Sequence, residues 1–122
     1  MHGDCSENEP PVVLEPGNNT NTGLMVNTNN KIIMEVLFNF RMERSSFELG
    51  KTVFVTDKNN QNVPCALTWS NDWQKLIITT NQTKLQFCSG NSCTISVKLS
   101  KEVKSAFDKV METDYSALFT IL

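Results

Sequence analysis

The side chains able to do acid, base or nucleophilic chemistry are few in this sequence and widely spaced. The single histidine, His2, lies in a polar N-terminal segment, so neither a Ser/His/Asp nor a Cys/His arrangement can form around it. Glu35 falls on the half-polar face of an apolar strand pattern, where a solvated or ion-paired carboxylate is the simplest interpretation. Other acidic residues follow no catalytic spacing, among them Glu43, Glu48, Asp57, Asp72, Asp108, Glu112 and Asp114. The sequence therefore predicts a protein that is not an enzyme and uses no cofactor.

Metal binding is not predicted either. Asp108, Glu112 and Asp114 offer the hard oxygen ligands that calcium prefers, but their spacing matches no known calcium loop. Zinc needs a set of cysteine and histidine ligands, and only one cysteine spacing here resembles a ligand pair. We expect no metal site.

The cysteine pattern singles out Cys88 and Cys93, which flank the loop Ser-Gly-Asn-Ser. Glycine, asparagine and serine are typical of hairpin loops, and cysteines facing each other across such a loop lie within reach of a disulfide. Two interpretations stay open: a disulfide between Cys88 and Cys93, or two reduced cysteines at a strand end. Cys65 falls in an expected strand and is interpreted as a small buried apolar residue.

The N-terminal segment, residues 1–9, is polar and acidic without periodicity, and we expect a flexible leader there. Cys5 stands alone in it, followed by Ser-Glu-Asn-Glu, which is similar to the start of a mature bacterial lipoprotein whose cysteine carries the lipid. The apolar lipobox that would precede such a cysteine is absent, and an incidental tail cysteine is the alternative. The sequence shows neither a signal peptide nor an apolar run long enough for a membrane span.

Two tryptophans, Trp69 and Trp73, flank a predicted turn. An exposed indole ring can stack on a sugar ring, so Trp73 is a candidate ligand contact. The alternative is structural: Trp69 falls in the inward series of its strand and belongs to the core, and Trp73 closes the end of the domain. The solvent exposure of Trp73 distinguishes the two readings.

β-Strands must position these residues, and the clearest predicted strand covers residues 31–42 (KIIMEVLFNFRM). Apolar residues occupy every second position, which gives a strand one fully apolar face: Ile32, Met34, Val36, Phe38 and Phe40. Further short strands are predicted over residues 10–14, 23–26, 52–56, 63–69, 75–80, 93–99 and 115–122. The count of seven to nine short strands separated by turn signals indicates an all-β sandwich of antiparallel strands.

One segment breaks this rhythm. Val103, Phe107, Val110 and Met111 recur at helical spacing, with Ser100 as a candidate N-cap. A short helix is therefore expected within residues 101–111, with an irregular loop burying Phe107 as the alternative.

Length and charge set the class of the protein. A chain of 122 residues is expected to form one domain, which we place at residues 10–122. The net charge of −2 argues against nucleic acids and anionic membranes as partners, since both are bound by basic surfaces.

The order of the segments resembles a bacterial immunoglobulin-like (Ig-like) domain of surface or secreted proteins. The resemblance covers about residues 10–122 and rests on Pro10-Pro11-Val12-Val13, Pro16-Gly17-Asn18, Val26-Asn27, the strand ending Phe38-Asn39-Phe40-Arg41-Met42, Leu67-Thr68-Trp69-Ser70-Asn71-Asp72, Lys75-Leu76-Ile77-Ile78-Thr79, Thr94-Ile95-Ser96-Val97-Lys98-Leu99 and Tyr115-Ser116-Ala117-Leu118-Phe119-Thr120. Two departures are a missing glycine within residues 105–109 and Thr94 where the family often has an aromatic residue.

The resemblance implies an Ig-like β-sandwich and a non-enzymatic role in an exported bacterial surface protein or lipoprotein. The expected location is extracellular, on the cell surface or in the periplasm. Such a module acts as a spacer or a protein-interaction domain, and its expected partners are neighbouring domains of a larger chain, a surface protein or a glycan. The alternative function is a carbohydrate-binding module that uses Trp73.

Overall fold

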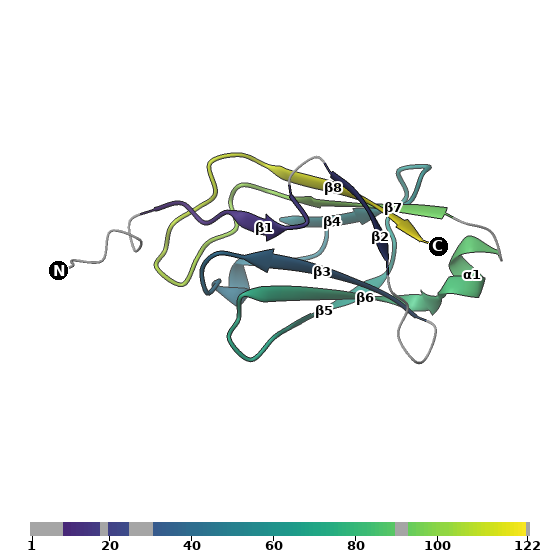
Figure 1. Cartoon of the computed structure of the whole chain (residues 1–122), viewed down its shortest axis with the longest axis horizontal. Helices are drawn as coiled ribbons and strands as arrows, with labels where there is room; N and C mark the ends of the chain where they lie inside the picture. The colour runs from purple at the N-terminus through teal and green to yellow at the C-terminus, as the bar shows by residue number, and fades with distance from the viewer. Residues whose placement is uncertain (1–8, 18–19, 25–30, 90–92, 122) are drawn as a thin grey trace.

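The computed structural model describes residues 9–17, 20–24, 31–89 and 93–121, which form two four-stranded sheets packed face to face (Figure 1). The first sheet has the order β1 (Val13–Glu15), β3 (Lys31–Phe38), β6 (Lys75–Thr83), β5 (Cys65–Trp69). The second has the order β2 (Thr20–Leu24), β8 (Tyr115–Ile121), β7 (Cys93–Leu99), β4 (Val53–Thr56). The predicted all-β, Ig-like sandwich is confirmed, and the eight strands of the described residues fall within the expected seven to nine. Residues 1–8, and with them Cys5, lie outside the described residues.

The prediction of antiparallel strands is wrong for one pair. β2 pairs with β8 in parallel, from Thr20 opposite Ala117 to Leu24 opposite Ile121, whereas the other strand pairs of the described residues are antiparallel. An antiparallel pair can be closed by a short hairpin, but a parallel pair needs a long connection. β2 and β8 lie near opposite ends of the sequence, so no turn between them sets their relative direction.

The alternation of β3 places four of the five residues of the predicted apolar series in the core, but the strand ends at Phe38, so Phe40 lies beyond it and is only half-buried. Ile32, Met34, Val36 and Phe38 are fully buried between the sheets, while the intervening residues face outward. The facing sheet contributes the same alternation: Ile95, Val97 and Leu99 from β7, and Ala117, Phe119 and Ile121 from β8. Side chains on a strand alternate with a period of two, so a register slip of one residue would turn this whole series to solvent.

The helix expected within residues 101–111 is absent. The chain there makes turns, with isolated bridges pairing Met42 with Ser105 and Lys104 with Val110. The N–H group of Ala106 donates to the carbonyl oxygen of Arg41, which lies far away in the sequence. This N–H group therefore cannot make the hydrogen bond of a helix. The alternative of an irregular loop is correct, but its expected burial of Phe107 is wrong, because 38% of that residue is exposed.

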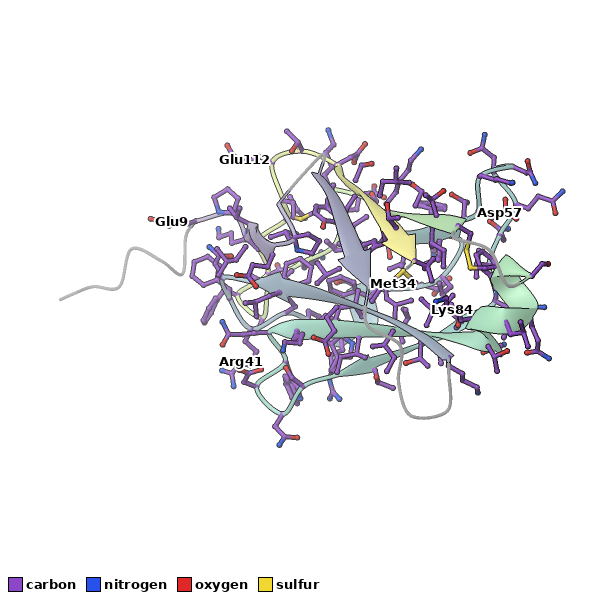
Figure 2. All side chains as sticks on the ribbon, turned by 45° about the vertical axis from the view of Figure 1, so that its right-hand side comes forward. Glu9, Met34, Arg41, Asp57, Lys84 and Glu112 are labelled. Atoms are coloured by element: carbon purple, nitrogen blue, oxygen red, sulfur yellow. A yellow bond between two sulfur atoms is a disulfide. The ribbon has the colours of Figure 1, made fainter. Side chains whose placement is uncertain are left out.

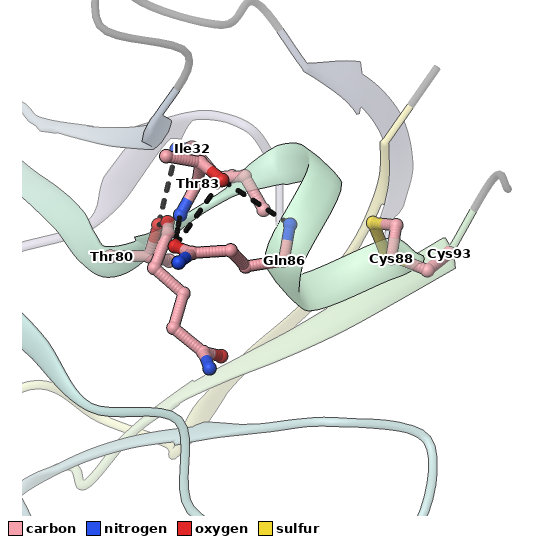
Figure 3. Close-up of a disulfide and its surroundings, with 7 residues drawn as sticks. Ile32, Thr80, Thr83, Gln86, Cys88 and Cys93 are labelled. Atoms are coloured by element: carbon pink, nitrogen blue, oxygen red, sulfur yellow. Dashed lines mark hydrogen bonds between the residues drawn. A yellow bond between two sulfur atoms is a disulfide. The ribbon is translucent and has the colours of Figure 1, made fainter. Parts of the chain in front are cut away.

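A helix that the sequence analysis missed lies elsewhere: α1 (Lys84–Cys88) directly follows β6. Thr83 is its N-cap and forms a capping box with Gln86, in which each side chain bonds the other's backbone N–H (Figure 3). The Thr-x-x-Gln spacing was a readable signal of this helix start. α1 ends at Ser89, whose backbone is left-handed. In the described part of the chain no helix is both long and apolar enough to span a membrane.

The two ends of the described chain lie at opposite ends of the sandwich. The chain enters beside β1 at one end and β8 finishes at the other, next to α1 (Figure 1). Tyr115, at the start of β8, donates its hydroxyl hydrogen bond to the carbonyl oxygen of Pro16 at 2.7 Å. This bond fastens the segment between β1 and β2 to the C-terminal strand.

Replacing Tyr115 with phenylalanine tests this bond. We expect the free energy of unfolding to fall by about 1 kcal/mol, because the carbonyl of Pro16 loses its donor in a mostly water-excluded place. Urea unfolding followed by circular dichroism measures the change. An unchanged midpoint would show that water replaces the hydroxyl without cost.

Alkaline pH is expected to destabilise the fold through two weak acids. Burial raises the pKa of the Cys65 thiol to about 11 and raises the pKa of Tyr115 as well. The unfolded chain therefore releases these protons at lower pH than the folded chain. The stabilising contribution of Cys65 is complete below pH 9 and is lost as pH rises through 9–11, and that of Tyr115 is lost only from pH 10 upward. Urea midpoints measured from pH 7 to 11 should fall, and the Cys65→Ala variant should show a smaller fall. An identical pH profile for this variant would contradict the assignment to Cys65.

Candidate functional site

Trp73 lies in the hairpin between β5 and β6, which Asp72 holds in shape. One carboxylate oxygen of Asp72 accepts hydrogen bonds from the hydroxyl of Ser70 and from the N–H of Gln74. The bond from Ser70, followed by the bond from Gln74, holds the pKa of Asp72 below its usual value, so the carboxylate stays ionised. The backbone of Trp73 is left-handed, with φ of 58°. The turn therefore presents the indole at the end of the sandwich.

Two arginines converge on the Trp73 ring. The guanidinium carbon of Arg44 lies 4.0 Å from the ring centroid, and that of Arg41 lies 5.9 Å from it. Both distances suit cation–π attraction. Within the described part of the chain, neither arginine lies within ion-pair distance of a carboxylate. The two arginines therefore hold the indole ring in place, and 37% of Trp73 remains exposed.

Backbone hydrogen bonds fix the three loops of this end to one another. Met42 donates to the carbonyl of Trp73 at 2.9 Å, and Glu43 donates to that of Lys104 at 2.9 Å. Ala106 donates to the carbonyl of Arg41 at 2.8 Å. The segment after β3 thus runs between the hairpin of Trp73 and the loop that precedes β8. This connectivity gives the arginines a defined position beside the indole.

More apolar surface surrounds the same end. Phe40 packs edge-on against Phe107, with ring centroids 6.1 Å apart. Phe107 and Val110 are both partly open to solvent. We call these apolar side chains of the loops at this end, together with Trp73, the loop-end patch (Phe40, Trp73, Phe107 and Val110). Exposed apolar side chains at one end of a domain are suited to contact with another protein surface.

The acidic residues at this end of the sandwich are spread over several loops and do not form one cluster. An open depression of about 410 Å³ is lined by Glu43, Ser45, Ser46, Glu48, Lys51, Thr52, Glu102, Lys104 and Asp108. Asp108 pairs with Lys104 at 3.2 Å, and Asp114 accepts the N–H of Lys101 at 2.9 Å. The described residues contain no group of three His, Cys, Asp or Glu side chains placed to hold a metal ion. Glu35 is exposed and pairs with Lys75 at 3.6 Å.

Trp69 lies apart from Trp73, against the core. Its ring stacks on Phe38 at 6.4 Å between centroids and meets Phe47 edge-on at 4.8 Å. These contacts leave Trp69 half-buried. A stacking surface for a ligand would therefore rest on Trp73 alone.

At the opposite end of the sandwich, Cys88 and Cys93 form a disulfide with their Cα atoms 5.5 Å apart (Figure 3). The bond joins the last residue of α1 to the first residue of β7. Cys65 is a free, half-buried thiol in the described residues, and its raised pKa makes it unreactive near neutral pH.

The sequence analysis predicted Trp73 as a candidate contact but missed Arg41 and Arg44. Nothing in the local sequence links them to a tryptophan some thirty residues away. Their proximity arises because β3 and β6 are paired, which brings the segment after β3 beside the hairpin that precedes β6. Figure 2 shows Arg41 at one end of the sandwich and Asp57 at the other.

Replacing Arg44 with alanine should uncover the indole. We expect a loss of about 0.5–1 kcal/mol in stability, the usual strength of an exposed cation–π contact, together with stronger quenching of tryptophan fluorescence by acrylamide. The Trp73→Phe background is the control, since the emission of Trp69 should not respond to Arg44. Unchanged quenching in the wild-type background would mean that Arg44 does not cover the ring in solution.

No protein-family model matches the chain, and no curated protein matches its sequence. Solved structures do match in fold. Escherichia coli alpha-2-macroglobulin in its native conformation is 17% identical with a TM-score of 0.66, covering 93% of this chain and 6% of that protein. A crystal structure of the same macroglobulin spanning domains MG0-NIE-MG1 is 18% identical with a TM-score of 0.66, covering 93% of this chain and 32% of that one.

The N-terminal part of the bacterial S-layer protein SbsC is a third match. It is 16% identical with a TM-score of 0.63, and the match covers 95% of this chain and 24% of that one. At these identities the comparisons show a shared fold. The chain thus has the Ig-like sandwich of domains that form small parts of longer bacterial proteins.

Proposed function

We propose that this domain is a non-enzymatic Ig-like module of an exported bacterial surface protein or lipoprotein, acting as a spacer or protein-interaction domain between neighbouring domains. The observation that carries the proposal is the position of its two ends. A chain that enters beside β1 and leaves after β8 keeps whatever it joins on opposite sides of the sandwich (Figure 1). The fold matches, which are parts of longer bacterial chains, support the same role.

The disulfide supports an exported location. Disulfides persist in oxidising compartments such as the periplasm and the cell surface, and cytosolic thiols are kept reduced. The Cys88–Cys93 bond therefore favours a domain that acts outside the cytoplasm. Lipid attachment through Cys5 is part of the proposal, and mass spectrometry of the protein purified from its host membrane would detect the acyl chains.

The loop-end patch supports an interaction role. It lies at the end where the chain enters, so a domain joined there would meet Trp73, Phe107 and Val110. The hydrogen-bonded loops beneath the patch hold its shape before a partner arrives, which lowers the ordering cost of association.

The spacer role is tested by placing the domain between two fluorescent proteins and measuring energy transfer. A rigid spacer should give a transfer efficiency that does not change with moderate salt or added osmolyte, and that exceeds the efficiency of the unfolded chain, which is longer from end to end. The control is the same fusion carrying Phe38→Ala, unfolded in urea. Transfer equal to that of the unfolded control would overturn the spacer role.

One observation favours glycan binding as a second function: part of Trp73 is open at the tip of a hairpin. The Arg44 guanidinium competes for the ring that a sugar would stack on. A glycan array probed with the wild type and with Trp73→Ala separates the two functions. Signals lost only in the variant would establish glycan binding, and an array without signals for the wild type would remove it.

A further inference from the structure

The sequence contains two arginines, Arg41 and Arg44, and both lie at the ring of Trp73. Every other basic side chain of the sequence is a lysine, apart from His2. A guanidinium group differs from an ammonium group because it is planar, stacks on aromatic rings and presents a rigid fork of N–H donors that matches a carboxylate. Two such groups at one exposed indole are therefore suited to binding an anion.

The two acidic residues that lie next to this cluster in the sequence have other partners. Glu43, which precedes Arg44, accepts a hydrogen bond from the hydroxyl of Ser45 at 3.2 Å. Asp72, which precedes Trp73, accepts its hydrogen bonds within its own turn. In the described part of the chain, no carboxylate lies within ion-pair distance of either arginine. An anion from a partner would therefore relieve the repulsion between two like charges that face the same ring.

The backbone around the two arginines is held in place before a partner arrives. Met42 lies between them, is fully buried, and donates its N–H to the hairpin that carries the indole at 2.9 Å. The carbonyl oxygen of Arg41 accepts the N–H of Ala106 at 2.8 Å, and that of Arg44 accepts the N–H of Phe47 at 3.1 Å. A partner that binds here therefore meets guanidinium groups whose starting positions are fixed, which lowers the cost of ordering them.

The charge around the cluster limits the kind of anion that fits. The open depression at this end is lined by both chain neighbours of Arg44, which are Glu43 and Ser45. Its other acidic lining residues are Glu48, Glu102 and Asp108. A long polyanion that crosses this end of the sandwich would be repelled by these carboxylates, whereas a short stretch with one or two carboxylates would not. The surroundings therefore favour a short acidic stretch of protein over a charged polymer.

The position of Arg44 also favours a carboxylate over a neutral sugar. Its guanidinium carbon lies 4.0 Å from the centroid of the Trp73 ring, so the stacked group covers one face of the indole. A stacked guanidinium keeps its N–H donors in its own plane, where they can bond both oxygens of a carboxylate. We propose that Arg41, Arg44 and Trp73, the arginine site, dock an acidic stretch of a partner protein through its Asp or Glu carboxylates. This inference rests on the interaction role proposed above.

An NMR titration of the full chain tests the arginine site. The probe is the end-blocked peptide Gly-Ser-Glu-Glu-Ser-Gly, and the control peptide has two glutamines in place of the glutamates. The indole N–H signals are followed in isotope-labelled protein, and the Trp73→Phe variant identifies the signal of Trp73. We expect this signal to move saturably with millimolar probe while that of Trp69, whose ring packs on the core, stays in place. An unmoved Trp73 signal, or equal movement with the glutamine peptide, would overturn the proposal.

Charge-removing variants assign the binding to the two arginines. Arg41→Gln combined with Arg44→Gln should weaken binding of the probe by at least about ten-fold, because the charge-assisted hydrogen bonds are lost. The matched control combines Lys58→Gln with Lys98→Gln, which removes the same charge from exposed positions in the hairpin after β4 and in β7. This control should bind as the wild type does. Equal weakening in the two double variants would show that net charge alone matters and would contradict the arginine site.

Arg44→Lys separates the guanidinium fork from its charge. Lysine keeps the positive charge but loses the planar fork and its stacking on the indole, so binding should weaken by about three-fold or more. This variant also provides the second test if the double glutamine variant fails to fold, which circular dichroism detects. Binding as tight as that of the wild type would mean that the fork is not used and would count against the proposal.

Two further comparisons separate the arginine site from other roles. A galacturonic acid trimer presents carboxylates on sugar rings, and tighter binding of this trimer than of the peptide would overturn a protein partner. The energy-transfer experiment tests the spacer role independently. A domain that behaves as a rigid spacer but shows an unmoved Trp73 signal loses the arginine site and keeps the spacer role. A moving Trp73 signal in a domain that fails the energy-transfer test supports the arginine site without the spacer role.

Discussion

Replacing Phe38 with alanine is expected to lower the free energy of unfolding by about 3–5 kcal/mol, the usual cost of removing a buried phenyl ring. Phe38 is 0% exposed and ends the apolar series of β3. Its ring contacts Phe47 at 5.6 Å and Trp69 at 6.4 Å between centroids, so the substitution leaves a cavity lined by two aromatic side chains. Single domains have a total stability of about 5–15 kcal/mol, and the variant should be close to unfolding. Urea unfolding monitored by circular dichroism measures the loss.

Phe54→Ala is the matched control for this prediction. Phe54 lies on the outer face of β4 and is 36% exposed, so its removal leaves no closed cavity. The expected loss is below about 1 kcal/mol. Similar losses for the two phenylalanines would mean that the interior of the sandwich is not packed around Phe38.

The second large effect is expected from breaking the disulfide. Replacing Cys88 and Cys93 together with serine should lower the stability by roughly 2 kcal/mol, because the open chain gains the entropy of a short loop on unfolding. The cost also includes a buried hydroxyl at Cys88, which lies within the core cluster. Thermal unfolding with and without reductant measures it: the wild type should lose stability in reductant, and the double variant should not respond.

Cys65→Ser separates the disulfide from general thiol effects. Cys65 is free and half-buried, so this variant keeps the disulfide and its response to reductant. If the melting temperature of the wild type is the same with and without reductant, Cys88 and Cys93 are thiols in solution. The proposed export of the protein would then lose one of its supports.

The two ends of the sandwich contribute differently to the proposed role. The end with the loop-end patch offers aromatic surface for contact, and the end with the disulfide holds the sheets together where β8 finishes. A spacer needs both a firm exit for the chain and a stable contact with what precedes it. The double replacement of Cys88 and Cys93 with serine addresses the first property, and the Arg44→Ala variant addresses the second.

Local patterns were enough to predict the two-layer sandwich. Alternation with a period of two places Ile32 and Met34 on one face and Ile95 and Val97 on the face opposite, and this depends only on the geometry of an extended chain. The loop residues between Cys88 and Cys93 likewise indicated a pair of cysteines close in space.

Tertiary structure decided the features that depend on distant partners. The helical spacing of Val103 and Phe107 was overridden because the neighbouring backbone bonds to Arg41 and Met42, which no window of local sequence includes. The contact between Arg44 and Trp73 exists only once β3 and β6 are paired. The parallel direction of β2 along β8 has the same origin, since no turn joins the two strands and only the completed sandwich aligns them.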